Sequence, residues 1–350
     1  MATSIYEFAQ LPEAAPTSAL RAGRRARSAG EAPRVGVIFN PRSHRNRDSE
    51  HETLDCPNVQ VAKPWDRAEL PEALAQFAEN GIDLLIINGG DGTVRDVLTC
   101  GQGVFGDDWP ALAVLPKGKT NALTVDLDVP PEWDEKAAIA AFDNGARLVR
   151  RPIEVRELSK KQGSRVLGFI LGAGAFAHAT ETGQSAHKLG AFNSAVVAVT
   201  ALWGLMQALF AGRSNPWRRG SRMSIKLGSR RTEMTHSGKG DAAYRQLLFA
   251  TTLERLPAGL NPFGALRTGL RLIAVDQLSR WMTPLLPFVA TGKKTKGLRE
   301  KGIHPVSVSE FTLEIDDAFI FDGEAFPAGE YQISQGPMLE FVTPLKSDQA

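Results

Sequence analysis

The sequence predicts a two-domain protein, with an N-terminal doubly wound α/β domain followed by a C-terminal antiparallel β-sandwich domain. Apolar runs without polar alternation at 34–39, 84–87 and 112–115 are typical of parallel strands covered on both faces. Helical patterns alternate with these runs, as in a doubly wound sheet. Beyond residue 150, short β-type runs follow one another with few helices between them, which favours an antiparallel sandwich or barrel.

The N-terminal elements can be placed from their ends and their spacing. The first strand is rich in β-branched residues and ends at Asn40 and Pro41. A helix with apolar residues three and four positions apart closes at Gly81, which is a typical C-terminal stop. The expected order is strand 34–39, strand 59–62, helix 66–80, strand 84–87, helix 94–98, strand 112–115, helix 119–126 and helix 132–144.

The C-terminal elements are mostly strands. They are expected at 166–171, 223–227, 246–252, 269–275, 306–315 and 319–321, with helices near 186–212 and at 277–291. We therefore expect a mobile basic tail at 1–33, an α/β domain at 34–150 and a β-sandwich domain at 151–345. No internal repeat is evident.

The composition is that of a soluble globular protein, with 43% hydrophobic and 23% charged residues. Cys56 and Cys100 are too few for a cysteine metal cluster and show no CxxC spacing, so we expect free thiols in a reducing compartment. The N-terminus has no apolar secretory segment, and a cytoplasmic protein is expected. The uncharged segment 191–210 has nearly the length of a membrane span, but its polar residues favour a buried or membrane-surface helix.

Basic residues gather in three stretches, at 21–47, 213–231 and 293–301. The stretch 213–231 holds seven basic residues and no acidic one. Such stretches can be solvated surface, or they can attract an anionic partner such as lipid headgroups or nucleic acid.

The most informative motif follows the strand at 84–87. Gly89, Gly90 and Gly92 are expected to allow positive φ and to let a ligand approach the backbone. The freed amides, next to a helix start at about Thr93, would form an anion cradle. A carboxylate at Asp91 in such a cradle implies a cation or a proton, so the motif indicates phosphate chemistry with a metal.

Two further loops should meet this motif, because Asn40 and the segment 116–121 also follow strands at the carboxyl edge of the sheet. A Walker A loop is excluded, since Ala113 stands where that motif needs its first glycine. A dinucleotide fingerprint is also excluded, because Arg95 replaces its third glycine.

The ordered motifs resemble the diacylglycerol kinase catalytic domain, whose superfamily includes bacterial lipid kinases, sphingosine kinases and ceramide kinases. The resemblance runs from about residue 34 to 344. The residues that carry it are Asn40-Pro41-x-Ser43, Gly89-Gly90-Asp91-Gly92-Thr93, Pro116-x-Gly118-x-x-Asn121 and Asp322-Gly323-Glu324.

The resemblance implies ATP bound with Mg²⁺ in a cleft between the two domains. Asp91 would act on the Mg²⁺–phosphate unit, with Asp96 as a second metal-binding carboxylate where relatives usually carry Glu. Asp322 or Glu324 would accept the proton of a lipid hydroxyl, while the other orients that hydroxyl or holds the metal. The implied nucleotide-binding residues are Asn40, Pro41, Ser43, Gly89, Gly90, Asp91, Gly92, Thr93, Lys119 and Asn121.

Each motif has a simpler structural reading. Asp322-Gly323 is also the strongest short-range hairpin signal. Asp91 could be a turn-forming residue, and Asn121 could cap a helix.

Three departures from the family pattern concern nucleotide contacts and a structural metal. Lys119 stands where relatives usually carry Thr, and His44 where they commonly carry Gly. Bacterial members often hold a structural Mg²⁺ through an Asp-Gly pair, but here Thr268 precedes Gly269, so no structural magnesium is expected.

The sequence thus favours an ATP-dependent lipid kinase that acts on a diacylglycerol-like hydroxyl at the inner face of the membrane, with no nucleic-acid partner. One alternative is a soluble kinase of the NAD kinase type, against which Asn40-Pro41 and Asp322-Gly323-Glu324 argue. Another is a non-catalytic nucleotide-binding regulatory protein, which the departure at Lys119 allows. The acceptor lipid and the oligomeric state stay open.

Overall fold

The computed structural model forms two compact units. Of the described residues, the first comprises those up to Pro152 together with 165–168 and 336–345, and the second comprises 153–159 and those from Phe169 to Gln335. The residues that the structure describes are 27, 31–46, 57–65, 67, 69–159, 165–177, 216–279, 282, 286–293 and 297–345.

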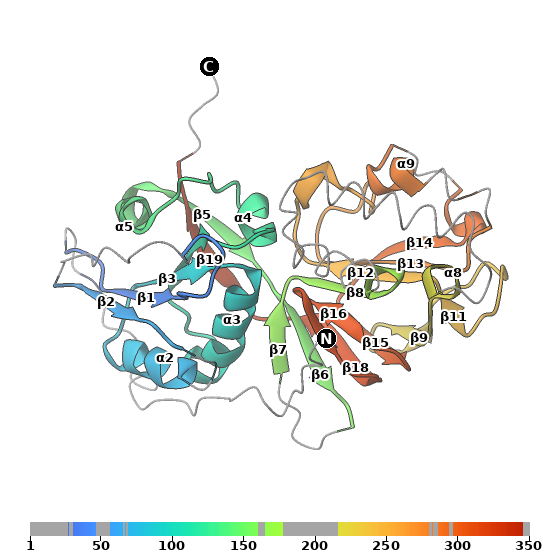
Figure 1. Cartoon of the computed structure of the whole chain (residues 1–350), viewed down its shortest axis with the longest axis horizontal. Coiled ribbons are helices and arrows are strands. Elements are labelled where there is room, and N and C mark those ends of the chain that lie inside the picture. The colour runs from blue at the N-terminus through green and yellow to red at the C-terminus, as the bar shows by residue number, and fades with distance from the viewer. Residues whose placement is uncertain are drawn as a thin grey trace. The chain divides into compact units, whose positions relative to one another are not determined.

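A largely parallel sheet forms the centre of the first unit (Figure 1). Its strands lie in the order β2-β1-β3-β4-β19-β5, and only β5 runs antiparallel to its neighbour. Their bounds are Val59–Ala62 (β2), Val35–Phe39 (β1), Leu84–Gly89 (β3), Ala111–Pro116 (β4), Leu339–Thr343 (β19) and Ala146–Arg150 (β5).

Helices cover both faces of this sheet, which confirms the doubly wound α/β prediction. Leu70–Glu79 (α2) and Asp91–Phe105 (α3) lie on one face, and Glu135–Asn144 (α5) lies on the other (Figure 1). The strands β1 and β3 are buried along their whole length, because side chains on both faces pack against helices. The short helix Ala122–Asp126 (α4) follows β4.

Two antiparallel sheets form the second unit, as the sequence predicted. One has the order β14-β13-β12-β8-β16-β17, and the other contains β10-β9-β15-β18-β6, with β11 paired to β9. The rings of Phe319 and Tyr331, one from each sheet, meet edge to face with centroids 4.9 Å apart. The bounds of the first sheet are Ile303–Val308 (β14), Leu270–Val275 (β13), Leu247–Thr251 (β12), Ile170–Gly174 (β8), Phe319–Phe321 (β16) and Glu324–Phe326 (β17). Those of the second are Thr232–Glu233 (β10), Ser221–Leu227 (β9), Glu310–Ile315 (β15), Gly329–Gln335 (β18), Ile153–Glu157 (β6) and Tyr244–Arg245 (β11).

The domain division differs from the expected 34–150 and 151–345 at the C-terminal strand. The strand β19 returns to the first unit, where it lies between β4 and β5. Phe341 and Val342 are buried there, so the sheet of the first unit depends on residues from the far end of the chain. A strand without local sequence partners cannot be assigned to a sheet from periodicity.

Several element bounds also differ from the prediction. The run at 166–171 divides into Arg165–Gly168 (β7), which packs against α3, and β8. The run at 306–315 divides into β14 and β15. The helix expected at 94–98 begins three residues earlier and extends to Phe105, because its buried face continues through Val104.

The expected tail at 1–33 lies almost wholly outside the described residues, and the helix near 186–212 and the segment 191–210 lie entirely outside them. Of the helix expected at 277–291, the structure describes Leu286–Ala290 (α9). Within the described ranges, no helix combines the length and the apolar character that crossing a membrane requires.

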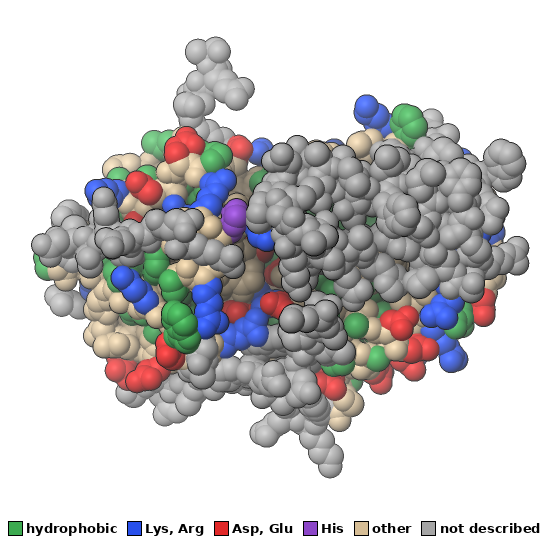
Figure 2. All heavy atoms as spheres, in the orientation of Figure 1, with side chains coloured by type: hydrophobic (Ala, Val, Ile, Leu, Met, Phe, Trp, Pro, Cys, Tyr) green, Lys and Arg blue, Asp and Glu red, His purple; other side chains and the backbone are tan. Residues whose placement is uncertain are grey.

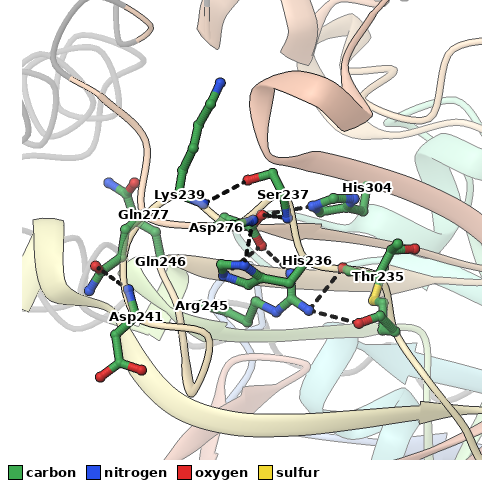
Figure 3. Close-up of polar contacts among 12 residues, drawn as sticks. Thr235, His236, Ser237, Lys239, Asp241, Arg245, Gln246, Asp276, Gln277 and His304 are labelled. Carbon is green, nitrogen blue, oxygen red and sulfur yellow. Dashed lines mark hydrogen bonds and ion pairs between the residues drawn. The ribbon is translucent and has the colours of Figure 1, made fainter.

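A buried ionic cluster joins one loop of the second unit to its first sheet (Figure 3). Asp276, which follows β13, forms an ion pair with Arg245 and a hydrogen bond of 2.9 Å with His304 Nε2. Its carboxylate also accepts a hydrogen bond of 2.8 Å from the backbone N–H of Ser237. His236 Nε2 lies 3.6 Å from the same carboxylate. The loop at 234–241 is therefore held by one buried negative charge.

Two pKa shifts follow from this arrangement. Burial opposes ionisation of Asp276, but hydrogen bonds from His304 and Ser237 and attraction to Arg245 outweigh it and lower the pKa of Asp276. Burial lowers the pKa of His236, and attraction to Asp276 offsets this only in part.

We expect the second unit to be acid-sensitive because of this cluster. A lowered carboxyl pKa contributes stability that is present above the ordinary pKa of Asp and is lost as pH falls through the folded value. A lowered His pKa likewise means that the unfolded chain binds the proton first, so stability falls as pH drops below about 6.5. Asp276→Asn should cost about 3 kcal/mol of unfolding free energy at pH 7, because Arg245 is left buried without its anion. Urea unfolding at pH 7, 5.5, 4 and about 2.5 measures both effects, because the contribution of Asp276 is lost only below about pH 4.

The exposed carboxylate of Glu314 offers a matched control. Glu314→Gln should change the unfolding free energy by less than about 0.5 kcal/mol. Equal pH dependence in wild type and Asp276→Asn would show that the cluster does not govern acid stability.

Candidate functional site

Three loops of the first unit meet at the carboxyl edge of its sheet. In the strand register, Phe39 lies opposite Asn88, and Gly89 lies opposite Pro116. The backbone N–H of Asn40 donates to the carbonyl of Asn88 at 3.0 Å. The convergence expected from the sequence is therefore present in the structure.

The glycines of the central loop allow close approach of backbones and not positive φ, which corrects the sequence interpretation. A Cβ on Gly90 would lie 2.8 Å from Gly118 Cα, and one on Gly118 would lie 2.6 Å from Gly90 Cα. A Cβ on Gly89 would lie 2.5 Å from the Thr93 side chain. None of Gly89, Gly90 and Gly92 has positive φ, and Gly90 is extended at φ −94° and ψ −176°.

Gly92 differs from its neighbours, because no heavy atom lies within 4 Å of where its Cβ would stand. This residue is the second of α3, so the open space adjoins free amides at a helix N-terminus. A ligand can therefore approach the helix end closely at this position.

Asp91 is the first residue of α3, and its carboxylate turns toward the start of α4. Its Oδ1 lies 3.5 Å from the backbone N–H of Leu123. Burial raises the pKa of Asp91, and the amides of Ala122, Leu123 and Asn121 offset this in part. The carboxylate thus links the central loop to the loop after β4, and its negative charge is poorly solvated.

The loop after β4 is closed by Asn121. This residue adopts the left-handed conformation at the N-cap position of α4, but its side chain makes no capping hydrogen bond. Instead its Oδ1 accepts from the Gly118 N–H at 2.7 Å, and its Nδ2 donates to the Gly118 carbonyl at 3.1 Å. Lys119, at the tip of the same loop, is exposed.

A buried amide network supports the first loop. Asn40 Nδ2 donates to Thr93 Oγ1 at 2.7 Å, which ties the first loop to α3. Asn46 Nδ2 donates to Asn88 Oδ1 at 2.9 Å, and Asn88 Nδ2 donates to Glu135 Oε1 at 2.9 Å. Pro41 and Ser43 lie in the turn of this loop, where the Ser43 N–H donates to the Asn40 carbonyl at 3.2 Å.

Sequence reasoning missed Asn46 and Glu135 as part of this site. Both are buried polar residues outside the recognised motifs. The buried Asn88 at the end of an apolar strand was the available signal, because such an amide needs partners.

An exposed tryptophan lies close to the first loop. Trp65 follows β2, and 62% of its surface is exposed. The Arg42 guanidinium stacks on its ring at 4.6 Å, and the Arg42 N–H donates to Asn40 Oδ1 at 2.9 Å. A flat aromatic surface therefore lies beside the loop that contacts Thr93.

Asp96 does not fit the role of metal ligand that the resemblance implied. Its Oδ2 accepts from Arg67 Nε at 2.7 Å, and its Oδ1 accepts from the fully buried Arg95 at 2.8 Å. Two guanidinium groups thus take the positions that a cation would need. Across the described part of the chain, no group of three or more His, Cys, Asp or Glu side chains is arranged to hold a metal ion.

The Asp322-Gly323 pair in the second unit forms the hairpin turn between β16 and β17. Both residues have positive φ, at 44° and 82°, and Phe321 pairs with Glu324 across the turn. The Asp322 carboxylate accepts hydrogen bonds from the backbone N–H groups of Phe169 and Ile170, at 3.0 Å and 2.8 Å. Asp322 therefore orients the turn, and the half-buried Glu324 follows it directly.

Residues 34–151 match the family model of the diacylglycerol kinase catalytic domain. Curated proteins named "Probable lipid kinase YegS", from Shigella flexneri and Escherichia coli O1:K1 / APEC, are each 29% identical over 90 residues. That match covers 26% of this chain and 30% of each relative. A crystal structure of a diacylglycerol kinase from Bacillus anthracis str. Sterne superposes with a TM-score of 0.56 at 17% identity, covering 89% of this chain and 97% of that one.

The resemblance to diacylglycerol kinase catalytic domains is thus confirmed for the segment that holds Asn40, Gly89–Thr93 and Asn121. At 17% identity, the superposition shows a shared fold.

We expect the Gly90–Gly118 contact to be essential for folding of this edge. Gly118→Ala should lower the unfolding free energy by about 1–3 kcal/mol, because the new methyl group would overlap the Gly90 backbone. Gly92→Ala should leave stability unchanged or raise it by up to about 1 kcal/mol, since the space there is open and alanine favours a helix. Thermal unfolding of both variants measures the difference. Equal melting temperatures for the two variants would show that the loops are not in tight contact.

Proposed function

We propose that the protein is an ATP-dependent lipid kinase that transfers the γ-phosphoryl group to the hydroxyl of a diacylglycerol-like lipid, with the nucleotide bound at the carboxyl edge of the first unit. The main support is the close contact of Gly90 with Gly118, next to which the Cβ position of Gly92 at the N-terminus of α3 is open. The match of residues 34–151 to the diacylglycerol kinase catalytic domain supports the same reaction class.

In this proposal, Asn40 and the amides of the Gly89–Thr93 segment bind the nucleotide phosphates. A helix N-terminus with accessible N–H groups favours negative charge, which phosphate supplies. Trp65, stacked on Arg42, provides a flat aromatic surface against which a nucleobase can pack.

Mg²⁺, when bound with ATP, would neutralise charge on the transferring phosphoryl group. Asp91 is suited to a position next to this cation. Its buried negative charge, held near backbone amides, would be offset by the positive charge of the metal. We assign no metal role to Asp96, whose oxygens bind Arg67 and Arg95.

The proton of the acceptor hydroxyl needs a base, and we assign this role to Glu324. The Asp322 carboxylate is engaged by two backbone N–H groups, which makes it a positioning residue for the turn. Glu324 is held next to it by the hairpin register.

A soluble kinase of the NAD kinase type and a non-catalytic nucleotide-binding protein are the alternatives. The first shares the GGDGT motif but does not require Asp322-Gly323-Glu324. The second requires nucleotide binding without transfer.

The first test is transfer of radiolabelled γ-phosphate from MgATP to diacylglycerol in mixed detergent micelles. Wild type should label the lipid, and Asp91→Asn should reduce turnover at least about a hundredfold. That variant should still fold, because the asparagine Oδ1 can still accept from the Leu123 N–H while a buried charge is removed. Gly92→Ala should weaken nucleotide binding at a melting temperature equal to or above that of wild type. Label in NAD, or a nucleotide-dependent thermal shift without transfer to any lipid of a total extract, would reject the proposal in favour of one alternative.

The second test separates the two residues of the turn. Glu324→Gln should lower kcat about 10²–10⁴-fold with little change in ATP affinity or melting temperature, because a general base contributes to turnover only. Asp322→Asn should lower the unfolding free energy by about 1–3 kcal/mol, since it weakens the hydrogen bonds to Phe169 and Ile170. Normal turnover in Glu324→Gln would exclude it as the base.

A further inference from the structure

Two large apolar side chains stand exposed on neighbouring turns of the second unit. Leu260 is 44% exposed and Phe288 is 53% exposed. Among the described residues of this unit, Leu158 is the other exposed large hydrophobic residue. Two of these three residues therefore come together at one place, although 28 positions separate them in the sequence.

The backbone of the two turns is held in place. The N–H of Asn261 donates to the carbonyl of Ala290 at 2.7 Å, which joins the turns directly. The N–H of Lys293 donates to the carbonyl of Phe288 at 3.0 Å. A Cβ on Gly292 would lie 3.0 Å from Asn261, so the two segments touch.

Buried apolar residues anchor both turns from beneath. Leu256 and Phe263 flank Leu260 in the sequence, and Val289 follows Phe288, and all three are buried. The Phe263 ring stacks on Phe249 with centroids 5.8 Å apart. The buried neighbours therefore hold the two turns in place, while the side chains of Leu260 and Phe288 stay exposed to solvent.

Cations outnumber anions around this pair. The exposed basic residues in the same segments are Arg255, Arg267, Lys293 and Arg299, against the exposed acids Glu254 and Glu300. Figure 2 shows a basic and a hydrophobic side chain side by side at the upper right, over the region where Figure 1 labels α9.

We propose that this surface, formed by Leu260, Phe288 and the surrounding cations, docks the protein on an anionic phospholipid bilayer. Leu260 and Phe288 would enter the boundary between headgroups and acyl chains, where burial of apolar area is favourable. The cations would meet the headgroup phosphates, and each adds attraction that salt screens. The combination of apolar tips and a cationic surround matches a bilayer better than a second protein copy, whose contact would need a larger apolar area. The idea that the bilayer supplies the substrate rests on the proposed lipid kinase function. Vesicle binding tests the docking surface independently of kinase activity.

Co-sedimentation with vesicles tests the surface directly. The anionic vesicles contain phosphatidylcholine with about 30% phosphatidylglycerol. Wild type should bind them more tightly than it binds vesicles of phosphatidylcholine alone. The double variant Leu260→Ser and Phe288→Ser should bind the anionic vesicles on the order of twentyfold more weakly, because two half-exposed apolar side chains no longer enter the bilayer. The double variant Lys293→Gln and Arg299→Gln should lose about fivefold in binding for each removed charge and should show a weaker salt dependence than wild type.

Leu158→Ser provides the matched control, since it removes an exposed leucine elsewhere in the same unit. It should bind anionic vesicles as wild type does. Unchanged vesicle binding of the apolar double variant at native melting temperature would overturn the docking surface. A loss of dimers in gel filtration, without a change in vesicle binding, would assign the surface to self-association instead.

Activity in detergent micelles separates this inference from the proposed function. Micelles deliver the lipid without a bilayer, so the apolar double variant should phosphorylate diacylglycerol in micelles as wild type does and fail only on vesicles. No transfer by wild type in micelles would reject the kinase proposal, and the vesicle-binding result would still decide on the surface.

Discussion

The contact between Gly90 and Gly118 brings two loops of the first unit together at the carboxyl edge of its sheet. With a Cβ at either position, the backbones would overlap, so only glycine allows the start of α3 and the loop after β4 to touch. Asp91 strengthens this junction by turning its carboxylate toward the amides at the start of α4, and Asn121 closes the loop back onto Gly118. The amides of α4 are thereby occupied, and the open approach lies at Gly92, at the start of α3.

This junction also explains the placement of the first loop. Asn40 reaches Thr93 on α3, and the buried amides of Asn46 and Asn88 extend the network to Glu135 on α5. A substitution at Gly90 or Gly118 would therefore shift all three loops, because buried polar groups that share hydrogen bonds move together or lose their partners. Such a preorganised edge suits phosphoryl transfer, in which positioning and electrostatics supply most of the catalysis.

The second unit uses carboxylates differently. Asp276 stabilises a loop through Arg245 and His304, and Asp322 orders the turn that carries Glu324. In both cases an acidic side chain serves the backbone geometry of its neighbours, and for Asp322 the resemblance alone had suggested a chemical role. In the proposed kinase, Glu324 then supplies the base, and the surface at Leu260 and Phe288 supplies the approach to the lipid.

The sequence by itself determined the α/β and antiparallel-β classes, the strands that end at the site and the family resemblance, because apolar periodicity and ordered motifs are local properties. The return of β19 to the first sheet, the pairing of Asp96 with Arg67 and Arg95, and the inclusion of Glu135 were decided only by the tertiary structure. The tertiary structure also showed that Gly90 is required for contact with Gly118 and not for a positive φ. It likewise brought the turns that carry Leu260 and Phe288 together. Each of these depends on which distant segments touch, and long-range packing leaves no periodic trace in the chain.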